Sequence, residues 1–121
     1  MAVVLCTGVD PLLLETRKLI LEQAGHTVFE ATNAREALAI CREQRVDIVL
    51  LCQTLLPEGK RAMVVAVRRH CPSAKILELY HSHQGKVLND VDEWMEVPPG
   101  VPQDLAKRVE EVAKQQPRIH H

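Results

Sequence analysis

The stretch Asp47-Ile48-Val49-Leu50-Leu51-Cys52 is the strongest strand signal in the chain. Its unbroken apolar middle is typical of a central strand in a parallel sheet, where helices cover both faces of the strand. A loop with Pro57 and Gly59 follows, and a helix is then predicted from about residue 60 to residue 70. The predicted buried face of that helix consists of Met63, Ala66 and Val67.

Short apolar runs and longer amphipathic runs alternate along the rest of the chain. Further strands are predicted at residues 3–6, 27–31, 74–79 and 94–97. Further helices are predicted at residues 12–24, at 34–44 and between Pro102 and Pro117, with a turn at 98–100. Strict alternation of strands and helices indicates right-handed βαβ units. We therefore expect an α/β fold with a flavodoxin-like, doubly wound, five-stranded parallel sheet in the order 2-1-3-4-5.

A sheet of this kind has its functional site beyond the carboxyl ends of the strands, where the winding reverses between strands 1 and 3. The positions to inspect therefore follow Cys6, Cys52 and Leu79. Fold alone does not decide function, so the residue types at these positions carry the argument.

The first predicted helix begins after Asp10, whose carboxylate can cap free amides, and Pro11 suits the first helical position. Helical spacing predicts an apolar stripe of Leu13, Ile20 and Ala24, widened by Leu12 and Leu19. The same spacing predicts that three charged side chains point mainly away from the stripe: Arg17, Lys18 and Glu22.

The chain has 121 residues, a net charge of −1 with neutral His, 46% hydrophobic residues and 26% charged residues. This composition indicates one globular domain, placed at residues 1–116 with a tail at 117–121, that needs no disulfide or metal to fold. The near-zero charge argues against binding to nucleic acid or a membrane surface, because both need an excess of basic groups. Only 2% of the residues are aromatic, which argues against binding of single-stranded nucleic acid by stacking of its bases on aromatic rings.

No apolar run approaches the ~20 residues needed to cross a bilayer. The first residues lack the basic segment and cleavage-like site of a signal peptide, so we expect a cytoplasmic protein. The four cysteines form no C-x-x-C pair: Cys6, Cys41, Cys52 and Cys71. In a reducing compartment they are predicted to be buried small hydrophobes and not a disulfide framework.

Five features occur in order along most of the chain: Val4-Leu5-Cys6 before Asp10-Pro11, Glu22-Gln23-Ala24-Gly25-His26-Thr27-Val28, Ala34-Arg35-Glu36-Ala37-Leu38, Asp47-Ile48-Val49-Leu50-Leu51 before Pro57, and Pro98 before the last helix. Together, from about residue 2 to residue 115, they resemble the response-regulator receiver domain of two-component signalling. These features are specific for the fold, and none of them is a catalytic signature.

The resemblance implies a set of chemical positions, of which the first is an acidic pair after strand 1. In the family this pair helps to hold a magnesium ion, which prefers oxygen ligands. Counted back from Pro11, the acidic pair falls on Gly8 and Val9, and neither has a side-chain oxygen. The neighbouring Asp10 is predicted to be the helix cap instead.

The remaining positions of the family also carry other residues here. The phosphoacceptor Asp falls on Cys52 when counted forward from strand 3, and on Gln53 when counted back from the following proline. The hydroxyl position after strand 4 falls on Tyr80, and the Lys position before the strand-5 proline falls on Val97. The resemblance therefore implies a degenerate receiver, or pseudo-receiver. We therefore expect no catalytic residue, no metal, no cofactor and no enzymatic activity.

The helix that follows strand 4 in the family has little room in this chain. Only 13 residues, 81–93, separate Tyr80 from Trp94. Two connections of ~2–6 residues each leave one or two helical turns, so this helix is predicted to be shortened or lost. The family's usual output and dimerisation surface uses this helix. Trp94 is therefore a candidate interface residue, and burial in the core is the equal alternative.

Cys52 and Tyr80 each have a functional interpretation besides a structural one, which for Cys52 is a buried, inert thiol. Cys52 could work with His81 or His83 as a thiol-dependent switch or a zinc site, although the ligand set has no firm fourth member. Tyr80 could act as a packing switch, or its ring could fill the space left by the missing ion.

A group of positive charges on the helix after strand 3 has two interpretations. It could bind an acidic partner, or it could be a solvated helix face, which the neutral balance of the whole domain favours. The group consists of Lys60, Arg61, Arg68 and Arg69.

The leading hypothesis is a receiver-like signalling domain that acts by protein–protein interaction without phosphorylation. The expected partner is a sensor kinase or another signalling protein, and a homodimer is a further candidate assembly. Neither nucleic acid nor a membrane is an expected partner. The alternative is the thiol- or metal-dependent switch centred on Cys52 with His81 or His83.

Overall fold

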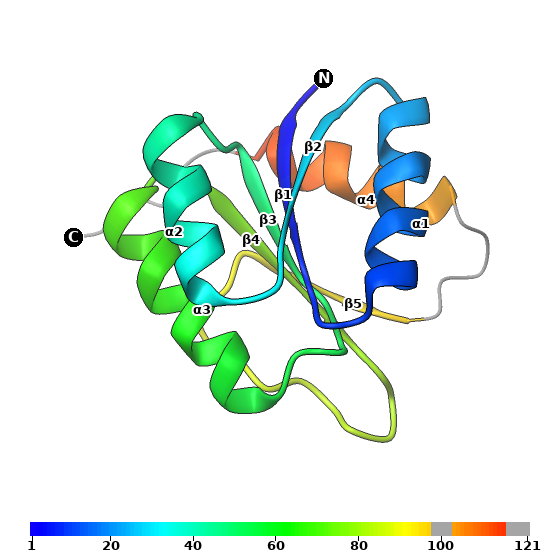
Figure 1. The fold of residues 1–121 in the computed structure, drawn as a ribbon. Coiled ribbons are helices and arrows are strands. Elements are labelled where there is room, and N and C mark those ends of the chain that lie inside the picture. Colours follow the sequence, from blue (N-terminus) through cyan, green and yellow to red (C-terminus); the bar gives the residue numbers. More distant parts are fainter. Residues whose placement is uncertain (98–102, 116–121) are drawn as a thin grey trace.

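Five parallel strands form one sheet in the order β2-β1-β3-β4-β5 (Figure 1). The computed structural model describes residues 1–97 and 103–115. The strands are β1 (Val3–Thr7), β2 (Thr27–Ala31), β3 (Ile48–Leu51), β4 (Lys75–Tyr80) and β5 (Glu93–Glu96). The helices are α1 (Pro11–Gln23), α2 (Ala34–Glu43), α3 (Pro57–His70) and α4 (Gln103–Ala113). The predicted fold class and strand order are confirmed.

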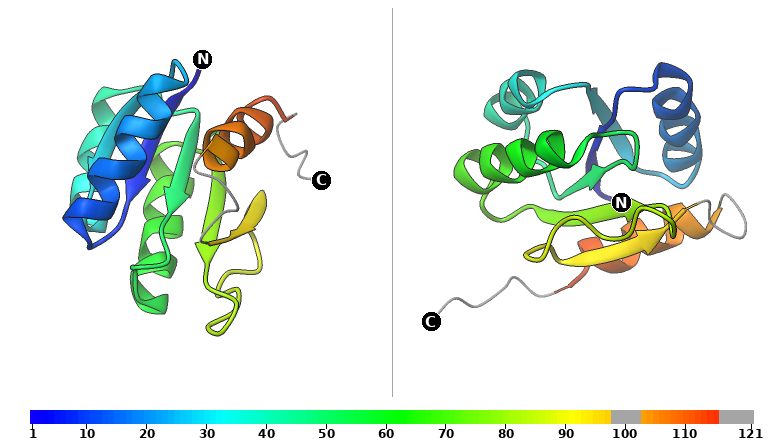
Figure 2. Two further views of the ribbon diagram at one scale, coloured as in Figure 1. Left: turned by 90° about the vertical axis from the view of Figure 1, so that its right-hand side faces the viewer. Right: turned by 90° about the horizontal axis from the view of Figure 1, so that it is seen from below.

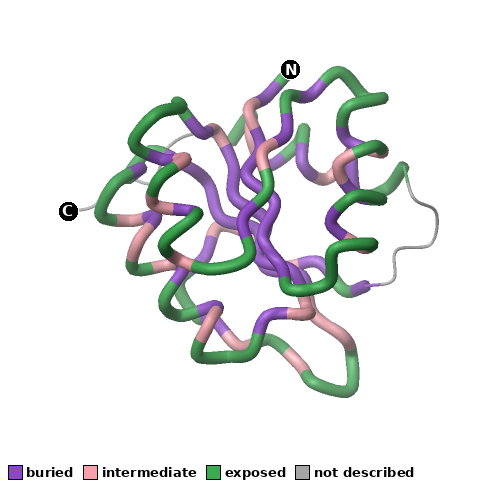
Figure 3. The backbone as a smooth tube through the Cα atoms, viewed as in Figure 1, coloured by how far each residue is buried: buried purple, intermediate pink, exposed green. Residues whose placement is uncertain are grey.

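The apolar runs of the sequence become the buried centre of the sheet, as Figure 3 shows along the strands. All four residues of β3 are fully buried. β1 lies between β2 and β3, with Val4 opposite Val28 on one side and Ile48 on the other. The winding therefore reverses between β1 and β3, which places the expected site at the carboxyl ends of these two strands.

Helices cover both faces of the sheet and form two separate apolar cores. α1 and α4 pack on one face, whose core includes Leu14, Leu21 and Val109 (Figures 1 and 2). α2 and α3 pack on the other face, whose core includes Met63 and Val67. Both faces of the central strands are thus removed from water, which explains their continuous apolar sequence.

The predicted buried face of α1 is wrong. The structure buries Leu14, Arg17 and Leu21, whereas Leu12 is 75% exposed and Leu19 is 55% exposed. Leucine occupies three consecutive positions, 12–14, so the apolar pattern alone does not fix the rotation of the helix. Leu14 and Leu21 join the core, and Arg17 between them reaches a polar partner at the carboxyl edge of the sheet.

Element boundaries differ from the prediction by a few residues. α3 begins at Pro57 and not near residue 60, because proline fits the first turn of a helix, where its missing N–H leaves no broken bond. β5 starts and ends one residue earlier than predicted. The predicted turn at 98–100, the helix start at Pro102, and Pro117 with the tail at 117–121 lie outside the described residues.

The segment between β4 and β5 contains no helix, as predicted (Figure 2). Its residues Leu88 and Val91 are buried in the core beneath α2 and α3. An irregular, partly buried segment thus takes the place of a covering helix at this end of the sheet. In the described part of the chain, no helix has the length and apolar character of a membrane span.

Candidate functional site

The carboxyl end of β1 is closely packed and has no side-chain carboxylate until Asp10. Gly8 is buried, and a Cβ atom there would lie 2.8 Å from Oγ1 of Thr54 and 3.2 Å from Cβ of Cys52. The backbone N–H of Val9 donates to Oγ1 of Thr54 at 3.1 Å, while the Val9 side chain is 57% exposed. The loops after β1 and β3 are therefore in direct contact.

Asp10 is the cap of α1, as predicted. Its Oδ1 atom accepts hydrogen bonds from the backbone N–H groups of Leu12 and Leu13, at 3.1 and 3.3 Å. The carboxylate thus satisfies two amides that have no partner within the helix.

Cys52 follows β3 directly and is 1% exposed. Its Sγ atom lies 4.0 Å from Sγ of Cys6, which stands on the adjacent strand β1. Gln53 comes next and is half-buried, and its Oε1 atom accepts a hydrogen bond from Nη2 of Arg17 at 2.9 Å. The other terminal nitrogen of Arg17, Nη1, is buried and has no hydrogen-bond partner among the described residues.

The two thiols differ in acidity. The pKa of Cys52 is lowered, above all by the hydrogen bond with the Cys6 thiol and further by the positive charges of Arg17 and Lys60, which outweigh burial. The pKa of Cys6 is raised well above its ordinary value by the same hydrogen bond and by burial. Cys52 is therefore the more acidic thiol of the pair, and a thiolate formed there would accept a hydrogen bond from the Cys6 S–H group.

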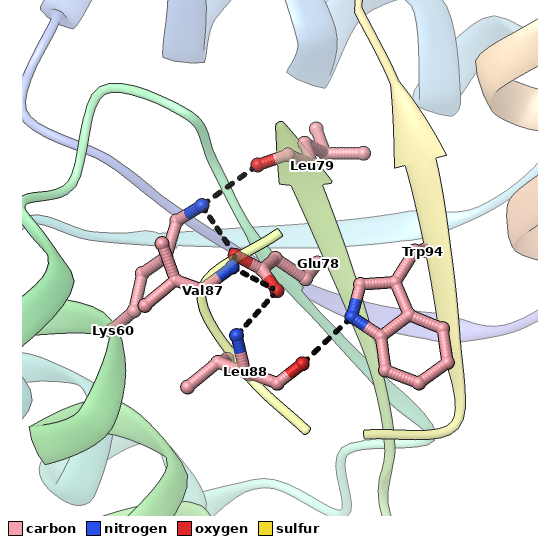
Figure 4. Close-up of polar contacts among 6 residues, drawn as sticks. All are labelled: Lys60, Glu78, Leu79, Val87, Leu88 and Trp94. Atoms are coloured by element: carbon pink, nitrogen blue, oxygen red, sulfur yellow. Dashed lines mark hydrogen bonds and ion pairs between the residues drawn. The ribbon is translucent and has the colours of Figure 1, made fainter. Parts of the chain in front are cut away.

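A buried ion pair stands at the carboxyl end of β4 (Figure 4). Nζ of Lys60, from the first turn of α3, donates to Oε2 of Glu78 at 2.7 Å and to the carbonyl oxygen of Leu79 at 2.9 Å. The side chains of Lys60 and Glu78 are 3% and 0% exposed. Such a pair is tolerated in the interior only when its remaining polar atoms are also satisfied.

Two backbone amides of the β4–β5 segment also donate hydrogen bonds to the Glu78 carboxylate (Figure 4). The N–H of Val87 donates to Oε2 at 3.0 Å, and the N–H of Leu88 donates to Oε1 at 2.9 Å. Nε1 of Trp94 on β5 in turn donates to the carbonyl oxygen of Leu88 at 2.9 Å. Glu78 therefore fixes the segment that replaces a helix, and Trp94 fixes it from the other side.

The structure buries Val97 and half-buries Tyr80 and Trp94. Val97, at the Lys position of the family, is 3% exposed and belongs to the core. Tyr80 is half-buried, and Nζ of Lys86 lies 5.8 Å from its ring centroid. Trp94 is also half-buried, with the same ammonium group 5.0 Å from its ring centroid, so it is neither a fully buried core residue nor a free anchor.

His81 and His83 lie against each other and not against Cys52. Their ring centroids are 5.1 Å apart, and Nδ1 of His81 lies 3.0 Å from the carbonyl oxygen of Val97. No hydrogen bond or ring contact joins either residue to Cys52 among the described residues. The same residues contain no group of three or more His, Cys, Asp or Glu side chains placed to hold a metal ion.

An open pocket of about 610 Å³ lies between the loop after β3 and the β4–β5 segment. Gln53, Thr54, Lys60 and Val87 are among its lining residues, and Tyr80 is not. The interpretation in which the Tyr80 ring fills the old ion site therefore finds no support in the lining of this pocket.

Three residues of this edge were missed or misplaced by sequence reasoning. Arg17 and Lys60 were assigned to solvated helix faces, yet both are buried with their charged groups at the carboxyl edge. Glu78 was not singled out. A charged residue inside the apolar run of residues 76–79 was the available signal, because such a residue needs a buried partner.

Comparison with protein-family models and with curated proteins finds no match for this chain. Solved structures do match. A CheY-like receiver domain from Methanospirillum hungatei is 25% identical, with a TM-score of 0.76 over 93% of this chain and 94% of that chain. Chemotaxis protein CheY4 of Vibrio cholerae is 26% identical, with a TM-score of 0.75 over 93% of this chain and 98% of that chain.

A third structure is described as belonging to a family of redox sensors in the streptococci that evolved from two-component response regulators. It is 17% identical, with a TM-score of 0.76 over 94% of this chain and 52% of that chain. At this identity the likeness concerns the fold alone. The strand order, the covering helices and these matches agree: the chain has the fold of the response-regulator receiver domains of two-component signalling.

Proposed function

We propose that the chain is a receiver-type signalling domain that acts as a protein-interaction module independently of phosphorylation. The observation that carries the proposal is the residue after β3. Cys52 stands there, 1% exposed, with the Cys6 thiol at 4.0 Å. An acceptor of a phosphoryl group needs an accessible carboxylate at this point, and this edge offers a buried thiol instead.

The neighbouring residues support the same proposal. Gly8 and Val9 have no side-chain oxygen for magnesium, a cation that prefers oxygen ligands. The amide oxygen of Gln53 is engaged by Arg17, and the Asp10 carboxylate caps α1. Without a cation, nothing would stabilise the charge that develops on a phosphoryl group during transfer. We therefore assign no catalytic residue.

The expected partners are those of receiver domains, namely kinases and other signalling proteins, in the cytoplasm. The surface formed by β5 and the β4–β5 segment is a candidate binding site for another protein or for a second copy of the chain. That segment has no helix in this chain, so the surface differs from the one that a covering helix would form. Trp94 is half-exposed there and remains the candidate interface residue.

The test is the intact mass of the full chain after incubation with magnesium and acetyl phosphate, with a phosphorylatable receiver treated in parallel. We expect no phosphoryl adduct on this chain and an adduct on the control. The matched variant is Asp10→Asn, which keeps the cap because Asn and Asp cap helices equally well. An adduct on the wild type overturns the proposal. Its loss in Asp10→Asn would identify the acceptor.

A thiol-dependent switch is the second candidate function, favoured by the contact between the Cys52 and Cys6 thiols. The solved structure from the streptococcal redox sensors has the same fold and makes such a use of a receiver fold plausible. The metal-dependent form, with His81 and His83 as ligands, has no support, since the described residues bring no third ligand to them.

A further inference from the structure

We propose that Cys6 and Cys52 form a redox-active dithiol in which a peroxide oxidises Cys52 and Cys6 then closes a reversible disulfide between β1 and the end of β3. This inference rests on the second candidate function and narrows it to two residues. It does not depend on the absence of phosphorylation. Three features of the molecule carry it: the geometry of the two thiols, the buried guanidinium group of Arg17, and the position of Cys52 at a strand end.

The two thiols already face each other. Cys6 stands opposite Leu50 on the neighbouring strand, and Cys52 lies two residues further along that strand, so all three point to the same face of the sheet. The Sγ atoms are 4.0 Å apart. A disulfide bond is about 2.05 Å long, so closing it requires the sulfur atoms to approach by about 2 Å. Cys52 is the first residue after β3, and its backbone N–H still donates to the carbonyl oxygen of Thr7 on β1 at 3.1 Å, which keeps Cys52 beside the strand that carries Cys6.

Arg17 supplies the charge that this chemistry needs. The residue is 6% exposed, and Nη1 is buried without a hydrogen-bond partner among the described residues. A buried guanidinium group with a free N–H is unfavourable unless an anion lies beside it. A Cys52 thiolate would be such an anion, and the positive charge of Arg17 contributes to the lowered pKa of that thiol.

Oxidation of Cys52 requires an opening of the structure around it, because the residue is 1% exposed. Gln53 and Thr54 are half-buried and line the open pocket at this edge. Displacement of the Gln53 side chain from Arg17 would open a path from the pocket to the sulfur atom. A peroxide as small as hydrogen peroxide needs only a narrow opening, whereas a bulky alkylating agent needs a larger one.

The chemistry balances with peroxide as the oxidant. The Cys52 thiolate attacks one peroxide oxygen, the O–O bond breaks, and the products are a sulfenic acid on Cys52 and a hydroxide ion that takes up a proton to become water. The Cys6 thiol then attacks the sulfur of the sulfenic acid and forms the S–S bond. The hydroxyl group leaves as a second water with the Cys6 proton. Two thiols are oxidised and one peroxide is reduced to two waters.

The disulfide would change the carboxyl edge of the sheet. It removes the thiolate beside Arg17, so the guanidinium group loses its anion and the hydrogen bond to Gln53 becomes its main remaining contact. Cys52 moves toward β1, and the loop with Thr54 that contacts Gly8 and Val9 must follow. The redox state of the pair thereby sets the shape of the pocket.

The test uses the reduced full chain treated with hydrogen peroxide, denatured in the presence of an alkylating agent, and analysed by intact mass and peptide mapping. We expect a Cys6–Cys52 linked peptide that dithiothreitol reverses, with Cys41 and Cys71 still alkylated. A Cys41–Cys71 link formed first, or a disulfide between two chains, overturns the inference.

Two single variants separate the inference from the function on which it rests. In Cys6→Ala we expect no disulfide and a Cys52 sulfenic acid trapped by dimedone, while Cys71→Ala should form the Cys6–Cys52 link at the wild-type rate. If Cys52 is oxidised in the wild type but never pairs with Cys6, the inference fails and a thiol switch stands. If no cysteine reacts in the folded chain, both fail. Circular dichroism of each variant checks that it is folded.

Discussion

The four cysteines form two pairs on opposite faces of the sheet, and the two pairs have different surroundings. Cys6 and Cys52 lie at the carboxyl edge, on the face covered by α1 and α4. Cys41 of α2 and Cys71 at the end of α3 lie on the other face, where Sγ of Cys71 donates to the carbonyl oxygen of Cys41 at 3.7 Å. The second pair is the more exposed, with 9% for each residue against 0% and 1%.

Exposure and acidity therefore rank Cys41 and Cys52 in opposite order. Burial, followed by the neighbouring Cys71 thiol, raises the pKa of Cys41 to about 12. At the carboxyl edge, the Cys6 thiol and the cations Arg17 and Lys60 lower the pKa of Cys52 although it is more deeply buried. The comparison shows that the acidity of these two thiols follows from their buried partners and not from access to water.

The largest expected effect comes from removing a buried cation near the first pair. Lys60→Met leaves the Glu78 carboxylate buried without its counter-ion, and breaking a buried pair in this way costs about 3–5 kcal/mol. Urea unfolding followed by circular dichroism measures the loss. The second pair should be unaffected in any fraction that stays folded, because Lys60 acts on Cys52 and not on Cys41.

Two companion variants test the cause of that loss. Arg61→Met removes an exposed charge at the next position and should change stability by no more than about 0.5 kcal/mol. Lys60→Met with Glu78→Gln removes both charges and keeps an oxygen acceptor for the amides of Val87 and Leu88. The double variant should be more stable than Lys60→Met alone. A double variant that is less stable would argue against an uncompensated charge.

The second prediction tests the cause of the difference in acidity between Cys52 and Cys41. Arg17→Met removes the guanidinium group that helps to lower the pKa of Cys52, so a smaller fraction of this thiol ionises and its reaction with peroxide should slow several-fold. Peroxide oxidation at pH 7, sampled over time by mass spectrometry, gives the rate. Arg17→Lys keeps the positive charge, and its oxidation rate should lie between the rates of the wild type and Arg17→Met. Arg35→Met, on the exposed side of α2, is the matched control, and an equal slowing there would refute the assignment.

The third prediction concerns the effect of Cys41, from the second pair, on stability at alkaline pH. The pKa of Cys41 in the folded chain is about 12, above its ordinary value, so the unfolded chain loses this proton first as pH rises. Stability should therefore decline from about pH 8.5, the ordinary thiol pKa, toward pH 12. Cys41→Val should show a shallower decline in urea unfolding at pH 8, 9 and 10. Parallel curves for the two proteins would contradict the prediction.

The smallest expected effect lies on the acid side of neutral pH and concerns His26 and not the cysteine pairs. Burial, followed by the charge of the N-terminal ammonium group, lowers the pKa of His26, and Nδ1 of this residue accepts from the N–H of Ala2 at 3.0 Å. The unfolded chain therefore takes up the proton first, and stability should fall as pH drops below about 6.5. Thermal unfolding between pH 7 and 5 should show this slope in the wild type and in Cys41→Val, and a smaller one in His26→Asn.

β3 could be predicted because it is an uninterrupted apolar run of strand length. β2, β4 and β5 contain charged residues, so their prediction depended on the alternation of short apolar runs with helices. The proximity of Cys6 to Cys52 also follows from the sequence once strands 1 and 3 are placed side by side. The lost helix could be predicted from the 13 residues between Tyr80 and Trp94, too few for two connections and a helix of normal length.

The charged part of the site could not be predicted, because it depends on how helices are rotated and where their first turns begin. The leucines at 12–14 allow two rotations of α1, and only the folded sheet selects the one that brings Arg17 to Gln53. Lys60 was counted with three arginines of its helix, yet it lies in the first turn of α3, within reach of Glu78 on β4. His81 and His83 contact each other and the carbonyl oxygen of Val97, an arrangement that a His-x-His spacing does not reveal because it depends on the direction of the loop.

The hydrogen bond from Trp94 to Leu88 gives the molecule its own optical reporter. Trp94 is the single tryptophan of the chain, and its indole N–H is held by the same segment that Glu78 fixes from the other side. The ammonium group of Lys86 lies 5.0 Å from the ring centroid, so the indole fluorophore sits in a fixed electric field while the segment is in place. A displacement of the segment between β4 and β5 is therefore expected to change the emission of Trp94 without any added label.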